Sequence, residues 1–183
     1  TDCFSLHMNL GDTATIASSI ESLRKRWHHI DALIICAGYN KVTPFPEISE
    51  AEWRLVMDIN LNGPYFLLSA CANFFGDGAA AVLVSSVAGH TGAPHHAHYA
   101  AAKAGLINLT KSAARELAPR VRVNCVAPGI TLTEMGRDTA SNLAPDYART
   151  KLLAGRFAEP DEIARTIIFM ASPASSFIFG ATI

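Results

Sequence analysis

Three side chains near the middle of the chain, Ser86, Tyr99 and Lys103, could together move a proton. A phenol has a pKa of about 10, so alone it exchanges protons poorly at neutral pH, and a neighbouring ammonium group favours its ionised form. A serine hydroxyl could hold a substrate oxygen while the phenol gives that oxygen a proton or takes one from it. These residue types therefore predict general acid–base catalysis at an oxygen atom.

The elements around these residues predict that their side chains meet. The apolar run of residues 80–84 is typical of a buried parallel strand, and Ser86 follows its carboxyl end, where open α/β sheets bind ligands. Residues 99–118 are rich in alanine and contain no proline, which predicts a helix with Tyr99 and Lys103 four apart on one face. Both side chains can therefore contact one ligand.

The Tyr-x-x-x-Lys spacing, with Ser86 before it at a strand end, resembles the active-site signature of the compact branch of the short-chain dehydrogenase/reductase family. Residues 99–106 resemble the bacterial 3-oxoacyl carrier-protein reductases and the related sugar or alcohol dehydrogenases of that family, a likeness that does not fix the substrate. The resemblance implies an α/β fold, a Rossmann-like three-layer αβα sandwich with a mainly parallel sheet. It also implies hydride transfer between NAD or NADP and a small carbonyl or alcohol substrate. Sugar-nucleotide epimerases share the Tyr/Lys pair, but the short chain argues against them.

The resemblance implies a role for each catalytic candidate. Tyr99 is the acid or base, Lys103 lowers its pKa and holds the nicotinamide ribose, and Ser86 positions the substrate oxygen. Asn60 is implied as a fourth catalytic residue, whose backbone carbonyl holds a water that joins the lysine to solvent. The residues alone leave an alternative open, in which Asn60 satisfies backbone groups at a kink, because Pro64 should bend or break a helix predicted for residues 50–75.

Two turns supply most of the cofactor candidates. Residues 35–38 are similar to the family's Asn-Asn-Ala-Gly motif with both asparagines replaced, and Gly38 would let the backbone approach a flat ligand; a plain turn glycine is the alternative. Residues 128–129 resemble the family's Pro-Gly motif beside the nicotinamide. The implied cofactor site comprises Asn9, Ala37, Gly38, Tyr99, Lys103, Pro128, Gly129, Ile130 and Thr133.

The remaining pattern alternates strands with helices, which predicts a parallel sheet. An amphipathic helix should follow Asp12, and a final helix should open with the acidic residues and proline at 159–162. Residues 131–153 show weak periodicity, as expected of a mobile lid over the substrate. The further predicted strands are residues 4–8, 31–36, 120–126 and 177–183.

Histidines and cysteines raise the question of a metal. His90, His95, His96 and His98 crowd one loop, but no other ligands stand at the expected spacing, and solvated histidines that shape the substrate entrance are the favoured interpretation. The cysteines at positions 3, 36, 71 and 125 are widely spaced, so we interpret them as small buried residues rather than as zinc ligands or a disulfide framework. We therefore expect no metal.

Composition predicts one domain over residues 1–183 with a cytoplasmic location. Hydrophobic residues make up 50% of the chain, and the formal net charge is −1. This balance implies no attraction to nucleic acid or to a membrane surface. The apolar runs are far shorter than the roughly 20 residues of a membrane helix, and no signal peptide opens the chain.

The resemblance also leads us to expect a fragment of a longer protein. Family members begin with a strand, a Gly-x-x-x-Gly-x-Gly turn that cradles the cofactor's pyrophosphate and a second strand, and they end in Val-Asp-Gly-Gly. None of the 12 glycines here forms that turn. A catalytically silent truncated product or an oligomeric scaffold is therefore the alternative function, although neither would require all four catalytic candidates.

Assembly is the last expectation from the sequence. Related enzymes pair two of their helices with symmetry copies, which implies a homodimer or homotetramer with a two-fold interface. The residues expected to form that interface are apolar or small: Phe66, Phe74, Phe75, Ala101, Ala102 and Gly105.

Overall fold

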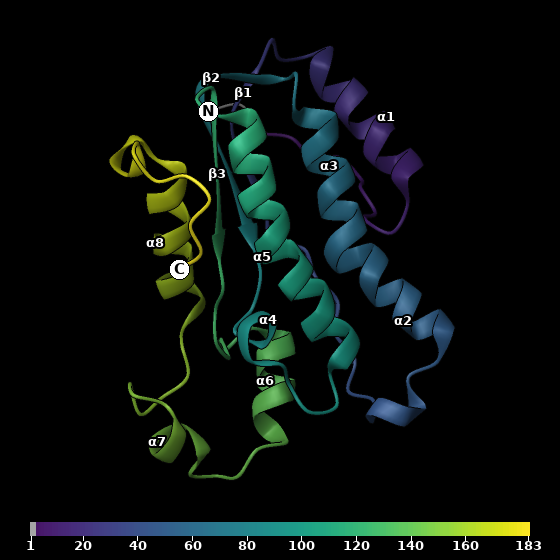
Figure 1. Ribbon diagram of the computed structural model, residues 1–183, viewed down its shortest axis with the longest axis vertical. Coiled ribbons are helices and arrows are strands. Elements are labelled where there is room, and N and C mark those ends of the chain that lie inside the picture. Colours follow the sequence, from purple (N-terminus) through teal and green to yellow (C-terminus); the bar gives the residue numbers. More distant parts are fainter. Residues whose placement is uncertain (1–2) are drawn as a thin grey trace.

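Residues 3–183 are described by a computed structural model, whose centre is a parallel three-stranded sheet in the order β1-β2-β3 (Figure 1). The strands are β1 (Ile30–Ile35), β2 (Phe75–Val84) and β3 (Val121–Val126). The α-helices are α1 (Thr13–Arg24), α2 (Glu50–Met57), α3 (Gly63–Cys71), α4 (Ala88–Thr91), α5 (Ala97–Leu117), α6 (Glu134–Ser141), α7 (Tyr147–Lys151) and α8 (Pro160–Ala171). Three short helical segments complete the chain: η1 (Phe45–Glu47), η2 (Asp58–Asn62) and η3 (Pro173–Ser175).

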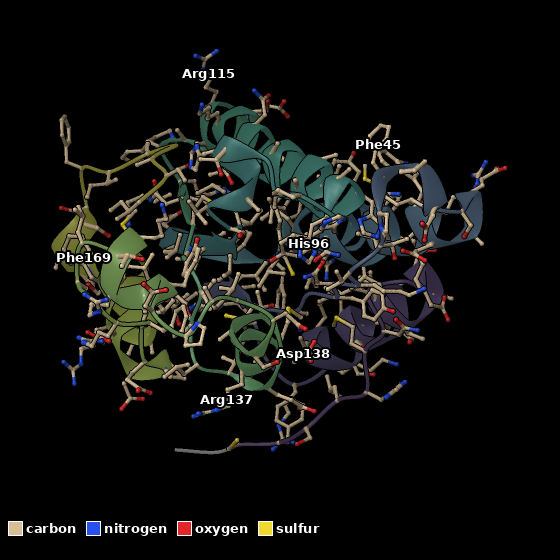
Figure 2. All side chains as sticks on the ribbon, turned by 90° about the horizontal axis from the view of Figure 1, so that it is seen from below. Phe45, His96, Arg115, Arg137, Asp138 and Phe169 are labelled. Carbon is tan, nitrogen blue, oxygen red and sulfur yellow. The ribbon has the colours of Figure 1, made fainter. Side chains whose placement is uncertain are left out.

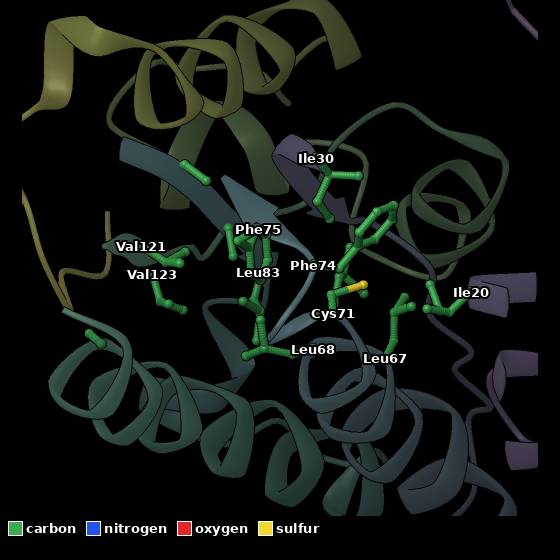
Figure 3. Close-up of a cluster of buried hydrophobic side chains, with 14 of the residues drawn as sticks. Ile20, Ile30, Leu67, Leu68, Cys71, Phe74, Phe75, Leu83, Val121 and Val123 are labelled. Carbon is green, nitrogen blue, oxygen red and sulfur yellow. The ribbon is translucent and has the colours of Figure 1, made fainter. Parts of the chain in front are cut away.

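Helices cover both faces of the sheet. The larger core lies between the sheet and α1, α3 and α5, and it includes Leu68, Leu83 and Val123 (Figure 3). On the opposite face, α8 packs through Met170 against Val82 and its neighbours. Because successive strand residues point to opposite faces, Val82 and Leu83 enter different cores. This arrangement confirms the predicted Rossmann-like αβα fold.

The helix predicted for residues 50–75 is interrupted where Pro64 requires it. α2 gives way to η2, a π-helical turn in which the N–H of Gly63 bonds to the carbonyl of Asp58, and α3 then begins. Proline has no N–H to donate to the carbonyl four residues earlier, which is that of Asn60. The predicted break is therefore confirmed, and it falls on the turn that carries Asn60.

The C-terminus of α8 is held by a side chain of the central sheet. Arg122 of β3 is only 5% exposed, and its guanidinium donates to the carbonyls of Met170 at 2.9 Å and Ser172 at 3.0 Å. It also donates to the hydroxyl of Ser175 at 2.7 Å. A charged group thus satisfies carbonyls that the end of a helix leaves without partners inside the helix.

Two of the predicted strands differ in the structure. Residues 4–8 form no strand; Phe4 packs instead edge-on against Trp27, with ring centroids 5.3 Å apart, because a strand requires a neighbouring strand to pair with. The strand predicted for residues 177–183 is reduced to one bridge beside β3, in which Thr182 pairs with Cys125. The other predicted strands match β1, β2 and β3 to within a few residues, apart from five additional residues, Phe75–Ala79, at the start of β2.

Burial corrects two further expectations. Cys71 and Cys125 are buried, but Cys3 and Cys36 are exposed, so the cysteines are not all core residues. Of the residues expected at an interface between copies, Phe74, Phe75 and Ala102 are buried inside this chain, whereas Phe66 and Ala101 are exposed. Phe74 and Phe75 are buried because they lie where the chain enters β2, in the main hydrophobic core, rather than on a helix surface.

No described helix is both long enough and apolar enough to cross a membrane.

Candidate active site

The two serines that follow β2 have different surroundings. Ser85 is buried, and its hydroxyl donates to the backbone carbonyl of Lys103 at 2.8 Å, which fastens the strand end to α5. Ser86 is half-buried, its hydroxyl accepts the N–H of Ala88 at 3.2 Å, and its side chain lies close enough to Tyr99 to influence the pKa of the phenol. The hydroxyl of Ser86 therefore lies beside the phenol, whereas the hydroxyl of Ser85 is occupied by its hydrogen bond to α5.

Tyr99 and Lys103 lie one turn apart near the beginning of α5. Lys103 is only 3% exposed, and its ammonium donates to the carbonyl of Val84 at 2.9 Å. The same nitrogen lies 5.5 Å from the centroid of the Tyr99 ring. The structure thus brings Ser86, Tyr99 and Lys103 together at the carboxyl end of β2.

Burial dominates the protonation of this group. Burial raises the pKa of Tyr99, and the hydrogen bond from Ser86 opposes that rise. Burial lowers the pKa of Lys103 to about 8, opposed by the thiols of Cys125 and Cys36. The net change is therefore a rise in the phenol pKa, opposite to the lowering expected from Lys103, because burial is the largest effect on this group.

Asn60 holds the turn that follows β1. Its fully buried side chain donates to the carbonyl of Tyr39 at 2.7 Å and accepts the N–H of Tyr39 at 3.2 Å. A methyl group on Gly38 would lie 3.1 Å from Oδ1 of Asn60 and 3.5 Å from Nζ of Lys103. The turn at Gly38 therefore passes close to the buried ammonium, and glycine avoids a tight contact there between a side chain and Asn60.

The other cofactor candidates occupy three places. Ala37 is exposed beside Gly38, and the loop with Gly129 follows Pro128, whose carbonyl accepts the N–H of Val87 next to Ser86 at 3.0 Å. Thr133 caps α6, and the carbonyl of Ile130 accepts the N–H of Ala158 at 3.2 Å. Asn9 lies in the turn before α1, where its side chain accepts the N–H of Gly11 at 2.9 Å.

The segment predicted as a lid forms α6 and α7, neither of which contains a buried residue. α6 lies at the same end of the molecule as α4 and the beginning of α5 (Figure 1). Figure 2 looks onto that end and shows His96 across from Asp138 of α6. The segment is tied back to the body of the protein where Thr131 pairs with Ala158.

The sequence reasoning missed three residues around Tyr99. His98 is fully buried rather than solvated, and its Nε2 lies 3.1 Å from Oε1 of Glu52. A methyl group on Gly89 would lie 2.8 Å from the carbonyl carbon of Lys103, so α4 can approach α5 only with glycine there. The Ser-Val-Ala-Gly run after β2 could have indicated Gly89, but no local pattern indicates the pairing of His98 with Glu52. Among the described residues, no three His, Cys, Asp or Glu side chains gather as a metal site.

Comparison with known proteins identifies the family. A family model described as enoyl-(acyl carrier protein) reductase matches residues 1–183. The 3-oxoacyl-[acyl-carrier-protein] reductase FabG of Staphylococcus aureus is 35% identical over 185 aligned residues, covering 100% of this chain and 75% of the relative. FabG of Thermotoga maritima is 35% identical over 179 residues, covering 96% and 72%. A crystal structure of a short-chain dehydrogenase/reductase, a glucose/ribitol dehydrogenase from Brucella melitensis, superposes with a TM-score of 0.90 at 34% identity, covering 94% and 70%.

This chain therefore belongs to the short-chain dehydrogenase/reductase family. It is an NAD(P)-dependent oxidoreductase, and it is similar to the FabG reductases.

Proposed function

We propose that the protein interconverts a 3-oxoacyl thioester and its alcohol, with Ser86, Tyr99, Lys103 and Asn60 as its catalytic residues. One observation carries this proposal: the side chain of Tyr99 lies between the half-buried Ser86 and the buried ammonium of Lys103, which is 5.5 Å from the centroid of its ring. The FabG reductases among its relatives support the substrate class.

In the reductive direction, the Ser86 hydroxyl holds the carbonyl oxygen of the substrate. The Tyr99 hydroxyl, which is protonated at neutral pH, gives its proton to that oxygen. A bound nicotinamide cofactor supplies the hydride to the carbonyl carbon. The carbonyl group thereby gains a hydride and a proton and becomes the alcohol, and Tyr99 recovers its proton from solvent.

Lys103 and Asn60 support this step from behind Tyr99. The ammonium of Lys103 would hold the cofactor ribose, and the Gly38 turn that passes close to this ammonium would lie along the cofactor. Asn60 keeps the Gly38 turn in place through its side chain. The backbone carbonyl of Asn60 receives no hydrogen bond from Pro64, which has no N–H. We assign this carbonyl the role of binding a water that returns protons to Lys103 and Tyr99. NAD and NADP both remain candidates, with Ala37, Pro128, Gly129, Ile130, Thr133 and Asn9 as further contacts.

The test is hydride transfer followed by nicotinamide absorbance. NADH and NADPH are each supplied with a 3-oxoacyl thioester, and NAD and NADP with polyols, because D-threitol dehydrogenase of Mycolicibacterium smegmatis is 32% identical over 176 residues. Turnover of the thioester is expected. If the protein turns over polyols alone, its substrates are polyols and the thioester proposal is wrong. If the folded protein turns over neither substrate, the alternative of a catalytically silent scaffold is favoured.

We further propose that the protein is a homodimer or homotetramer. Trp53, Tyr65 and Phe66 are each more than 40% exposed along α2 and α3, and Ala101 is exposed on the neighbouring α5. Burying such an apolar face between two-fold related copies would remove it from water. Light scattering should show that Phe66→Glu lowers the molar mass in solution. Phe45→Glu, on η1 and 77% exposed, is the matched control. A wild-type monomer at micromolar concentration would contradict the proposal.

Small molecules are the proposed ligands, and the cytoplasm is the proposed compartment. All four cysteines are free thiols, as is usual for proteins of a reducing compartment. The formal net charge of −1 favours neither nucleic acid nor an anionic membrane as a partner.

A further inference from the structure

A buried polar cluster lies directly beside Tyr99, and the catalytic steps above do not use it. His98, the residue before Tyr99, has no exposed surface. Its Nε2 lies 3.1 Å from Oε1 of Glu52 on α2, and its Nδ1 accepts the backbone N–H of Tyr99 at 3.0 Å. The ring therefore connects a carboxylate of one helix to the main chain of the candidate proton donor on another.

Hydrogen bonding fixes the form of this histidine. Nδ1 must be unprotonated to accept the N–H of Tyr99, so the proton of the neutral ring is on Nε2 and is donated to Glu52. The ammonium of Lys41, 2.7 Å from Oε2, and the hydroxyl of Thr43 on Oε1 hold the pKa of Glu52 down at about 2. The carboxylate is thus ionised and always able to accept the Nε2 proton.

The contact with Tyr99 acts as a cap for α5. The first N–H groups of a helix have no partner inside it, and His96, at the N-cap position, offers no side-chain hydrogen bond to them. The ring of His98 satisfies the N–H of Tyr99 instead. Two more bonds fasten the same turn to the loop before α2: the N–H of Thr43 donates to the carbonyl of His95 at 2.9 Å, and His96 Nδ1 lies 3.0 Å from Oδ1 of Asn40.

We propose that His98 and Glu52 are positioning residues that hold the main chain of Tyr99, and with it the phenol hydroxyl, at Ser86. The inference rests on the proposed function in so far as Tyr99 moves the proton. A displacement of the reacting group by about 1 Å can cost about 100-fold in rate. Loss of the pair should therefore lower kcat much more than it changes KM, because neither residue is expected to contact the substrate.

Two conservative variants separate the two hydrogen bonds. Asparagine carries its amide oxygen at the distance of Nδ1, so His98→Asn can still accept the N–H of Tyr99 but loses Glu52. Glutamine carries its amide nitrogen at the distance of Nε2, so His98→Gln can still donate to Glu52 but loses the cap. His98→Ala loses both. The matched control makes the same substitutions at His28, an exposed histidine after α1.

Kinetics and NMR provide independent measurements. We expect His98→Ala to lower kcat by about 10- to 100-fold, with the Asn and Gln variants in between, and KM within about threefold of wild type. In the free protein, nitrogen chemical shifts should place the His98 proton on Nε2, and hydrogen exchange at the Tyr99 amide should accelerate in His98→Ala and His98→Gln but not in His98→Asn. The Tyr99 phenol pKa should fall toward its ordinary value in His98→Ala as its burial loosens.

The outcomes distinguish this inference from the proposed function. A proton on Nδ1, unchanged Tyr99 amide exchange, or a folded His98→Ala variant with wild-type kcat would each overturn the positioning role. An inactive wild-type protein would overturn the proposed function, and the NMR measurements would still decide whether His98 holds Tyr99. If His98→Ala does not fold, the Asn and Gln variants carry the test.

Discussion

The beginning of α5 and the segment containing α6 and α7 lie at one end of the molecule, but they are built in opposite ways (Figure 1). His98 and Lys103 are almost completely buried, and each uses its side chain to bond other elements. α6 and α7 contain no buried residue. The difference indicates that the groups proposed to move a proton are held rigidly, whereas the segment expected to cover the substrate can change its residues at little cost to the fold.

The largest loss of activity is expected from a substitution at the beginning of α5. Tyr99→Phe removes only the hydroxyl, so the rate should fall by about 10²- to 10⁴-fold, the usual contribution of a positioned acid or base. Packing of the ring is kept, and the midpoint of thermal unfolding should change little. Steady-state kinetics and calorimetry measure both. A fully active Tyr99→Phe variant would show that Tyr99 is not the proton donor.

A second expected effect separates catalysis from stability at Lys103. Burial lowers the pKa of Lys103 from 10.5 to about 8, so at neutral pH the folded protein keeps a charge where it is poorly solvated. Lys103→Met removes that charge and keeps most of the volume. We expect it to abolish activity and to raise the free energy of unfolding at about pH 7 by about 1–2 kcal/mol.

The pH dependence of this gain has a definite sign. Below about pH 8 the lysine is protonated in both states, so the penalty of burial is fully present. Between about pH 8 and 10.5 the folded protein loses that proton first, so the wild type should regain stability relative to Lys103→Met. Denaturant unfolding at both ends of this range measures the change, with exposed Lys111→Met on the same helix as control. A methionine variant less stable than wild type at neutral pH would contradict this account.

The smallest effects on stability are expected from substitutions in the exposed segment that contains α6 and α7. Met135 of α6 is 40% exposed, so Met135→Ala should change the free energy of unfolding by no more than about 0.5 kcal/mol. If α6 covers the substrate, KM should change by about tenfold. Ile168→Ala on α8, an exposed site on another part of the surface, should leave KM unchanged. If Met135→Ala and Ile168→Ala have the same KM, α6 does not cover the substrate.

Features of the structure that depend on residues close together in the sequence could be predicted from the sequence. Residues 80–84 of β2 are a continuous apolar run, and Pro64 breaks a helix through its own missing N–H, so these features can be predicted from the local sequence. Residues 4–8 have a strand-like composition but no described partner strand, and composition alone cannot reveal that. Tyr99 and Lys103 were identifiable because helix geometry sets their separation.

The parts that could not be predicted depend on long-range contacts. His98 pairs with Glu52 across 46 positions, so in the sequence it looked like one histidine of a solvated loop. The direction of the Tyr99 pKa also depended on such contacts. Burial is produced by the whole packed domain, whereas the Tyr-x-x-x-Lys spacing shows only the neighbouring charge.

Arg122 gives the folding of the C-terminal region an order. The carbonyls at the end of α8 accept hydrogen bonds from a guanidinium that precedes them by 48–50 positions, so the end of α8 gains these bonds only once β3 is in place. Burial also lowers the pKa of this guanidinium, so in the folded protein these carbonyls take the place of water around its charge. α8 is therefore expected to fold late and together with the sheet, and its closing turn should open only when the sheet itself does.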